Sequence, residues 1–309
     1  MTTGTALLPE STANAWDRAT YAFLAEKQRR SGSDRTVQGY SGMLRHFFGT
    51  VGKTPDLVTS QEVFVWAYGK GLSAKTPSST TIGARIACLS SLYRFLIRMG
   101  MVQANPCDAL ERPKARQSTA RGLSAEEIQR LLAVVTDTRA GLRDRAIILT
   151  LVLTGRRRAE VLGMTASDFS REANTVYYSY RGKGGKTGRR ELPRPAYEAI
   201  EQALAAFGKN LATMGPTESL WPGNGSEGIT SGTFYLRLRK YLGAAGLPPS
   251  GCHVFRHSAA KLRRDAGETV EEVSRFLDHS SLAVTSVYLR RLEDESDRSW
   301  GKVAEAIGV

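Results

Sequence analysis

Cysteine is scarce in this 309-residue sequence, and long apolar runs are absent from it. Cys88, Cys107 and Cys252 are odd in number and show no CxxC spacing, which argues against a disulfide framework and against a zinc site. No stretch approaches the roughly 18 apolar residues of a membrane span, and residues 1–10 hold no basic segment followed by an apolar run. We therefore expect a soluble, cytoplasmic protein with no membrane partner.

Acidic residues are in deficit. The chain has 43 Lys and Arg against 30 Asp and Glu, a net charge of +13 and a pI near 9.9. Such a surplus attracts a polyanion, with nucleic acid as the obvious candidate, although a surface adapted for solubility gives the same charge. Residues 1–122 hold 16 basic and 8 acidic residues, whereas residues 123–309 hold 27 and 22. The larger excess on the smaller part indicates a DNA clamp, with the remainder free to be a catalytic body.

The N-terminal part shows apolar residues at helical spacing and no strand pattern. This spacing predicts a compact bundle of four helices, over residues 15–30, 36–48, 61–68 and 81–99. Gly100, Asn105 and Pro106 close the bundle. The basic, proline-containing stretch 111–122 is typical of a linker between domains.

The second part of the chain opens with a helix start. Ser124 precedes a helical pattern and has Glu127 three residues later, as in a capping box. The β-rich stretches 175–180 and 189–192 flank a basic, glycine-rich sequence and predict a hairpin. Helices are expected over residues 141–153, 157–163, 196–207, 230–245, 254–266, 270–277, 282–290 and 299–309. The predicted fold class is mainly α with a small antiparallel sheet.

Five short stretches of the second part collect side chains that bind phosphate or transfer protons. Arg157 stands at a predicted helix start, where free N–H groups and the helix dipole favour an anion. His253 and Arg256 lie one helical turn apart on one face. The remaining members are Lys183 on the hairpin tip, His279 after a helix, and Tyr288 nine residues further on. Taken singly, Tyr288 is as readily a packed tyrosine and Lys183 a solvated charge; the order of the set is what indicates a site.

These groups meet the needs of a phosphodiester attacked by a hydroxyl. Negative charge develops on the non-bridging oxygens, and the guanidinium forks of Arg157 and Arg256 suit its neutralisation. The leaving alkoxide needs a proton, which the amine of Lys183 can supply. The attacking phenol must lose one, and His253 is a plausible acceptor or shuttle.

The order arginine, lysine, His-x-x-Arg, histidine, tyrosine resembles that of the tyrosine recombinases, which include phage integrases and Xer-type chromosome-resolution enzymes. The matching stretches are Thr154–Val161, residues 181–186, residues 253–260, residues 277–281 and Tyr288. The resemblance implies catalytic roles for Arg157, Lys183, His253, Arg256, His279 and Tyr288, with Glu160 as the acidic residue that supports Arg157.

The resemblance also implies a domain plan and a reaction. Residues 12–110 would form a four-helix (SAM-like) core-binding domain, residues 111–122 a linker, and residues 123–309 a mixed α+β catalytic domain, the two domains clamping double-stranded DNA. Tyr288 would attack the scissile phosphate, form a 3′-phosphotyrosyl bond and release a 5′-hydroxyl, and a second strand's 5′-hydroxyl would reverse the step. We expect no cofactor, because this reaction needs neither ATP nor a metal. The sequence has no P-loop and no carboxylate cluster suited to Mg²⁺.

The apolar face of residues 299–309 must be covered. Trp300, Val303, Ala304 and Ile307 repeat at helical spacing. One expectation is docking on its own domain. The other, which the resemblance implies, is exchange of this helix between the protomers of a homotetramer on two DNA sites, with accessory DNA-bending proteins as possible further partners.

The sequence departs from the family pattern at three places. Arg156 and Arg158 flank Arg157 where the family usually has apolar neighbours. Lys186 is a rival to Lys183, because the hairpin is about two residues longer than in Xer-like relatives. Asp278 stands where a glycine commonly precedes the histidine, which alters the local turn or adds a negative charge beside His279.

Other basic residues are candidates for DNA phosphate contacts rather than for catalysis. They are Arg156, Arg158, Lys186, Arg189, Lys75 and Arg85. Two rival functions share these features. A type IB topoisomerase-like enzyme would relax supercoils with little sequence preference, and a DNA-binding regulator with a degenerate site would not need Tyr288.

Overall fold

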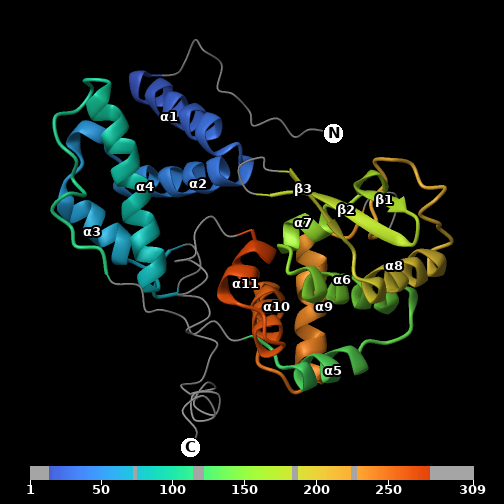
Figure 1. Cartoon of the computed structure of the whole chain (residues 1–309). Helices are drawn as coiled ribbons and strands as arrows, with labels where there is room; N and C mark the ends of the chain where they lie inside the picture. The colour runs from blue at the N-terminus through green and yellow to red at the C-terminus, as the bar shows by residue number, and fades with distance from the viewer. Residues whose placement is uncertain (1–13, 72–74, 114–121, 183–186, 224–227, 279–309) are drawn as a thin grey trace, which may run out of the picture. The chain divides into compact units, whose positions relative to one another are not determined.

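A computed structural model describes residues 14–71, 75–113, 122–182, 187–223 and 228–278 of the chain (Figure 1). The chain divides into two compact units, Met1–Ser118 and Thr119–Val309. Each unit has its own hydrophobic core. Within the described ranges, no helix is long and apolar enough to cross a membrane.

The described part of the first unit is helical. Its elements are α1 (Ala15–Ser31), α2 (Asp34–Val51), the 3-10 turn η1 (Pro55–Leu57), α3 (Ser60–Tyr68) and α4 (Ser79–Arg98). The four predicted α-helices are present, and both ends of each helix lie within about three residues of the predicted bounds. Helix α4 is buried along most of its length, and the hydroxyl of its Tyr93 donates to the carbonyl of Pro55 at 2.8 Å.

The second unit is built from helices around a small sheet. Its helices are α5 (Ala125–Ala133), α6 (Arg139–Thr154), α7 (Arg158–Leu162), η2 (Ala166–Asp168), α8 (Arg194–Ala206), α9 (Ser231–Ala244), α10 (His253–Asp265) and α11 (Val270–Phe276). The predicted capping box of α5 is present: the Glu127 backbone N–H donates to the Ser124 hydroxyl, and the Ser124 backbone N–H donates to the Glu127 carboxylate. The predicted helices over 282–290 and 299–309 lie outside the described residues.

The sheet is antiparallel, with strand order β1-β2-β3. The strands are β1 (Phe169–Glu172), β2 (Thr175–Arg181) and β3 (Thr187–Glu191). The central strand places Tyr178 opposite Phe169 on one side and opposite Arg190 on the other. Strand β1 was not predicted, because its four residues are mostly polar and only its pairing with β2 makes it a strand. The predicted fold class, mainly α with a small antiparallel sheet, is confirmed.

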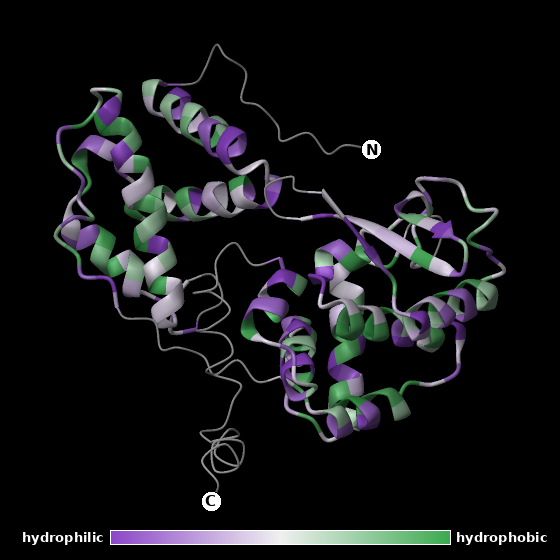
Figure 2. Cartoon of the chain, viewed as in Figure 1, coloured by the Kyte–Doolittle hydropathy of each residue, from purple (hydrophilic) through white to green (hydrophobic). Residues whose placement is uncertain are grey.

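Helix α6 forms the centre of the second unit. Its side chains are buried on nearly all sides, and α8 and α10 pack against it. Figure 2 shows amphipathic helices such as α8 with hydrophobic and hydrophilic colours along one helix, as expected for elements with one face on the core. The indole N–H of Trp221, which is fully buried, donates to the carbonyl of Val161 and holds the end of α7 on this core.

A buried charge cluster joins α6 to α9. Asp144 is fully buried, and its Oδ1 accepts hydrogen bonds from the adjacent Arg143 at 3.0 and 3.2 Å. Its Oδ2 accepts from Arg237 and, at 2.8 Å, from the Tyr241 hydroxyl. The carboxylate thus compensates a guanidinium, that of Arg143, of which only 5% is exposed.

We predict that Asp144→Ala lowers the free energy of unfolding by about 3–5 kcal/mol, because removing one partner leaves a buried charge without compensation. Glu198→Ala is the control, since its ion pair with Arg194 is exposed on both sides and is expected to contribute less than about 1 kcal/mol. Denaturant unfolding of the whole chain measures both. Equal losses for the two variants would contradict the assignment.

Candidate active site

The turn between α6 and α7 brings the matching stretch Thr154–Val161 against the end of α11. Gly155 ends α6 in the left-handed region, with φ of 61°, and its backbone N–H donates to the carbonyl of Leu151. A Cβ on Gly155 would lie 2.6 Å from the ring of Phe276 and 2.8 Å from the side chain of Leu277. Glycine is therefore required twice, for the backbone conformation and for the close approach.

Arg157 is held by Glu160 at the start of α7. One carboxylate oxygen accepts from the backbone N–H of Arg157 at 2.9 Å, and the other accepts from its guanidinium at 2.7 Å. The Glu160 side chain is 7% exposed and that of Arg157 is 33% exposed. Glu160 thus fixes both ends of Arg157 while one third of its side chain stays accessible, which is the geometry that an anion-binding arginine requires.

Arg256 lies in the first turn of α10 and is buried, with 6% of its surface exposed. Its Nη1 donates to the carbonyl of Gly155 at 2.8 Å, and its Nη2 donates to the carbonyl of Leu277. The Arg256 guanidinium, in the matching stretch 253–260, therefore contacts Gly155 of the stretch Thr154–Val161 and Leu277 of the stretch 277–281. The contacts fix the plane of the group before any ligand binds.

His253 is the first residue of α10, one turn before Arg256. Partial burial lowers the pKa of its imidazole below the ordinary value of 6.5. The positive charges of Arg256, Arg158 and Arg157 lower this pKa further. The described structure therefore brings three arginines around His253, and the imidazole is neutral at neutral pH, the form that can accept a proton.

Four of the residues expected at the site lie outside the described residues. They are Lys183, Lys186, His279 and Tyr288. Their roles, and the choice between Lys183 and Lys186, stay predictions. Among the described residues, no group of three His, Cys, Asp or Glu side chains is placed to hold a metal ion.

Arg156 has a different environment from the one predicted. Its side chain is 1% exposed and packs against the ring of Tyr180, 4.3 Å from the ring centroid. Its guanidinium donates to the carbonyls of Thr154 and Phe276 and to the carboxylate of Asp278. This burial argues against the DNA phosphate contact predicted for Arg156, because the group already has internal acceptors.

Arg85 also has internal acceptors, in the first unit. Its Nη1 lies within hydrogen-bond distance of the last carbonyls of α3 and of the loop that follows, those of Trp66, Ala67 and Gly69, at 2.8 to 3.0 Å. A cation at a helix C-terminus is favourable. The structure thus gives Arg85 a capping role, and its predicted contact with DNA stays a prediction.

The other predicted phosphate contacts differ in exposure. Arg158 is half-buried, and its guanidinium interacts with the Cys252 thiol, beside His253. Arg189 in β3 pairs with Glu172 across the sheet. Lys75 is exposed.

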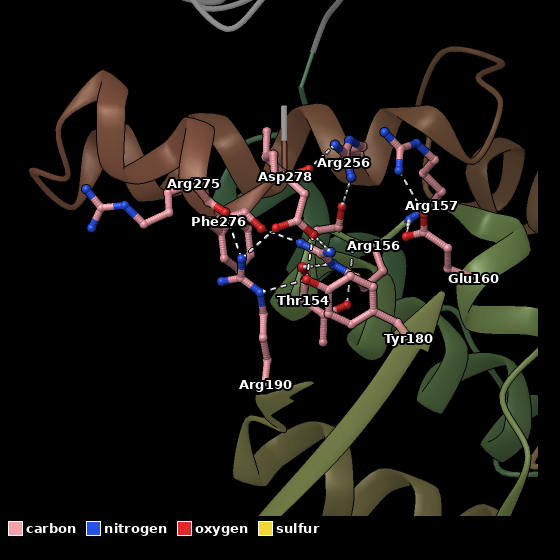
Figure 3. A network of polar contacts seen from close by, with 12 residues as sticks. Thr154, Arg156, Arg157, Glu160, Tyr180, Arg190, Arg256, Arg275, Phe276 and Asp278 are labelled. Carbon is pink, nitrogen blue, oxygen red and sulfur yellow. Dashed lines mark hydrogen bonds and ion pairs between the residues drawn. The ribbon is translucent and has the colours of Figure 1, made fainter. Parts of the chain in front are cut away.

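A polar network around Asp278 was not predicted (Figure 3). The Asp278 carboxylate accepts from the Tyr180 hydroxyl at 2.6 Å, from Arg190 at 2.7 Å and from Arg156. Asp278 has φ of 51°, in the left-handed region that glycine favours. Figure 3 shows Asp278 and Phe276 over Arg156 and Arg190, with Arg157 and Glu160 to one side. In the sequence, this contact was indicated only by two departures from the family pattern, the opposite charges of Arg156 and Asp278.

Residues 121–295, more than half of the chain, match the phage integrase family. The chain belongs to this family. The resemblance to tyrosine recombinases found in the sequence is thereby confirmed.

Relatives and solved structures agree with this membership. The tyrosine recombinase XerC of Roseiflexus castenholzii is 27% identical, over 86% of this chain and 87% of the relative. The XerC of Mycobacterium sp. (strain JLS) is 29% identical, over 90% and 93%. In fold, the chain is similar to the XerH site-specific recombinase bound to a palindromic difH substrate in a post-cleavage complex, with TM-score 0.65, 18% identity and coverage of 97% and 91%. It is also similar to a lambda integrase dimer bound to a core site, with TM-score 0.66, 18% identity and coverage of 90% and 98%.

We predict that Arg158→Ala raises the pKa of His253 toward 6.5. The pKa stays below 6.5, because burial and the charges of the other two arginines remain. NMR titration of the imidazole in both proteins measures the shift. Lys261→Ala is the control, since Lys261 pairs with Asp265 further along α10 and is not among the causes of the shift. A native pKa of 6.5 or above would contradict the cationic environment.

Proposed function

We propose that this protein is a site-specific DNA recombinase that cuts and rejoins strands through a 3′-phosphotyrosyl intermediate at Tyr288. One observation carries the proposal: Arg157, Arg256 and a neutral His253 converge in a chain that belongs to the phage integrase family. The tyrosine recombinase relatives along most of the chain's length support the same reading.

The proposed first step is an in-line displacement at phosphorus. The Tyr288 oxygen forms a bond to the phosphorus while the bond to the 5′-oxygen breaks, and the phenol proton passes to His253. Lys183 gives a proton to the leaving 5′-oxygen. A 5′-hydroxyl from a second strand then displaces Tyr288 by the reverse route. The energy of the broken phosphodiester bond is kept in the phosphotyrosyl bond. The second strand can therefore be joined without ATP.

The two arginines have complementary parts in this scheme. Arg157 is partly exposed and braced by Glu160, whereas Arg256 is buried and braced by backbone carbonyls. Braced donors need little reorganisation when charge develops on the phosphate oxygens, which is the condition for electrostatic stabilisation of a transition state. His279 would complete the set as a further donor to the phosphate.

We propose double-stranded DNA as the partner. The charge of +13 and the basic excess of residues 1–122 support it. XerH and lambda integrase, which share the fold, are described in complexes with DNA. Lys75, Arg85, Arg158 and Arg189 remain the proposed phosphate contacts among the described residues, and Lys186 is proposed outside them.

The test is recovery and sequencing of DNA attached covalently to the protein in expressing cells. We expect the native chain to trap discrete sequences and Tyr288→Phe to trap none, because phenylalanine has no nucleophilic oxygen. Dispersed trapping would favour a topoisomerase-like activity. DNA binding without any adduct would favour a regulator that has kept the fold and lost the chemistry.

The same assay separates the site from the clamp. Arg157→Ala is expected to lower adduct formation on the order of a hundredfold, by analogy with the loss of one oxyanion-stabilising donor, while DNA affinity changes little. Arg194→Ala, at an exposed pair at the start of α8, is the matched control. Equal loss of adduct and of affinity in Arg157→Ala would count against a role in the transition state.

We also propose a homotetramer on two DNA sites in which residues 299–309 dock on a neighbouring protomer. The apolar spacing of Trp300, Val303 and Ile307 supports an amphipathic helix that needs a partner surface. Truncation after Arg298 is expected to abolish synapsis while single-site cleavage persists. Recombination at the native level by the truncated chain would refute the exchange.

A further inference from the structure

The C-terminal end of α11 is held by three arginines from three different elements. The donor and carbonyl pairs are Arg190 of β3 with Arg275 at 2.7 Å, Arg156 with Phe276, and Arg256 of α10 with Leu277. The last carbonyls of a helix have no partner within it, and its dipole favours cations there. Three consecutive carbonyls are therefore fixed immediately before the chain reaches Asp278.

Two of these arginines hold the Asp278 carboxylate as well. Arg156 donates one nitrogen to Phe276 and another to Oδ2 of Asp278, and Arg190 binds Oδ1 at 2.7 Å. The Tyr180 hydroxyl adds a third bond to the carboxylate at 2.6 Å. Each guanidinium thus bridges the end of α11 and Asp278, two residues beyond it, so the chain direction at Asp278 is fixed from both sides.

The ion pair is strongly constrained on the Arg156 side. A guanidinium that is 1% exposed needs an anion, because an uncompensated buried charge is costly. Burial opposes ionisation of Asp278, but the hydrogen bonds from Tyr180 and Arg156 and the charge of Arg156 hold its pKa at about 2. Asp278 is thus an anion at neutral pH and is matched by two cations, so it does not present a net negative charge to a phosphate.

Arg156 and Asp278 are the two positions noted above where an apolar residue and a glycine are usual in the family. In this protein they contact each other across 122 positions of sequence. Asp278 keeps the left-handed conformation that a glycine would adopt freely. Aspartate enters this region more readily than most residues other than glycine, and the ion pair holds Asp278 in it.

We propose that the Arg156–Asp278 pair is a positioning device for DNA cleavage, which sets the direction of the chain into His279. Asp278 is joined to His279 by one peptide bond, and the nucleophile Tyr288 follows in the same segment. The proposal rests on the proposed function. It makes Arg156 and Asp278 positioning residues, not groups that touch the reacting phosphate.

The experiment compares Arg156→Leu, Asp278→Gly and the double variant with the native chain, on the DNA sequence that the native chain traps. Single-turnover cleavage is measured at saturating DNA, and DNA affinity is measured separately. We expect each single variant to cleave on the order of tenfold or more slowly, since small misplacements of catalytic groups cost this much or more, with affinity within about threefold. The double variant, which restores the apolar residue and glycine together, is expected to cleave within about threefold of the native rate.

Asp265→Asn is the matched control, because it removes the same charge from a solvent-accessible pair with Lys261 in α10. Its cleavage rate is expected to equal that of the native chain. Asp278→Asn serves if Arg156→Leu does not fold; it keeps the side-chain shape, removes the charge and is expected to slow cleavage without loss of affinity.

Rescue in the double variant shows that the two side chains act through each other, because substitutions at independent sites have effects that add. Slower cleavage by single variants that keep the native DNA affinity separates positioning from a merely structural defect, which would lower both. Single variants that cleave at the native rate, or a double variant as slow as the product of the two single effects, would overturn the positioning role alone. A native chain that forms no adduct would instead overturn the proposed function, and this role with it.

Discussion

The burial of positive charge beside the end of α11 is the constraint on which the second unit depends. Arg156 and Arg256 are both nearly inaccessible to solvent, at 1% and 6% exposure. Guanidinium groups have five N–H donors in a fixed plane, so burying two of them demands a set of acceptors in fixed positions. Backbone carbonyls from the α6–α7 turn and from the end of α11 provide most of these acceptors. If the two segments separated, the buried arginines would lose most of their hydrogen-bond acceptors.

This constraint explains why three of the matching stretches converge, although Gly155 lies 101 positions from Arg256 and Leu277 lies 21 positions from it. Arg256 joins Gly155 to Leu277, and Gly155 has no side chain to keep these segments apart. The sheet is drawn into the same cluster, because Tyr180 covers Arg156 and Arg190 reaches the end of α11. The hydrogen bonds to Gly155 and Leu277 thus orient the Arg256 guanidinium in advance. A phosphate-binding group needs the same fixed orientation.

Local signals explain which parts of the fold the sequence could predict. The end of α6 at Gly155 and the start of α5 at Ser124 were predicted correctly, because a left-handed glycine and a capping box act within a few residues. Strand β1 was missed because its identity comes from pairing. The Asp278 network was missed for the same kind of reason: Tyr180 and Arg156 lie 98 and 122 positions from Asp278. The proposed catalytic set could be named because the order of its residues matches a family, which no single residue reveals.

The lowered pKa of His253 follows from the same accumulation of positive charge. Arg157, Arg158 and Arg256 together make the site attractive to a phosphodiester and unfavourable to a second proton on the imidazole. A bound phosphodiester carries one negative charge and neutralises part of this field, so it raises the proton affinity of His253 when the substrate arrives. In the proposed function, the imidazole would thus be neutral before the phosphate binds and a stronger proton acceptor once the phosphate is bound. In that proposal, one cluster of arginines would both bind the phosphate and prepare His253 to receive the proton.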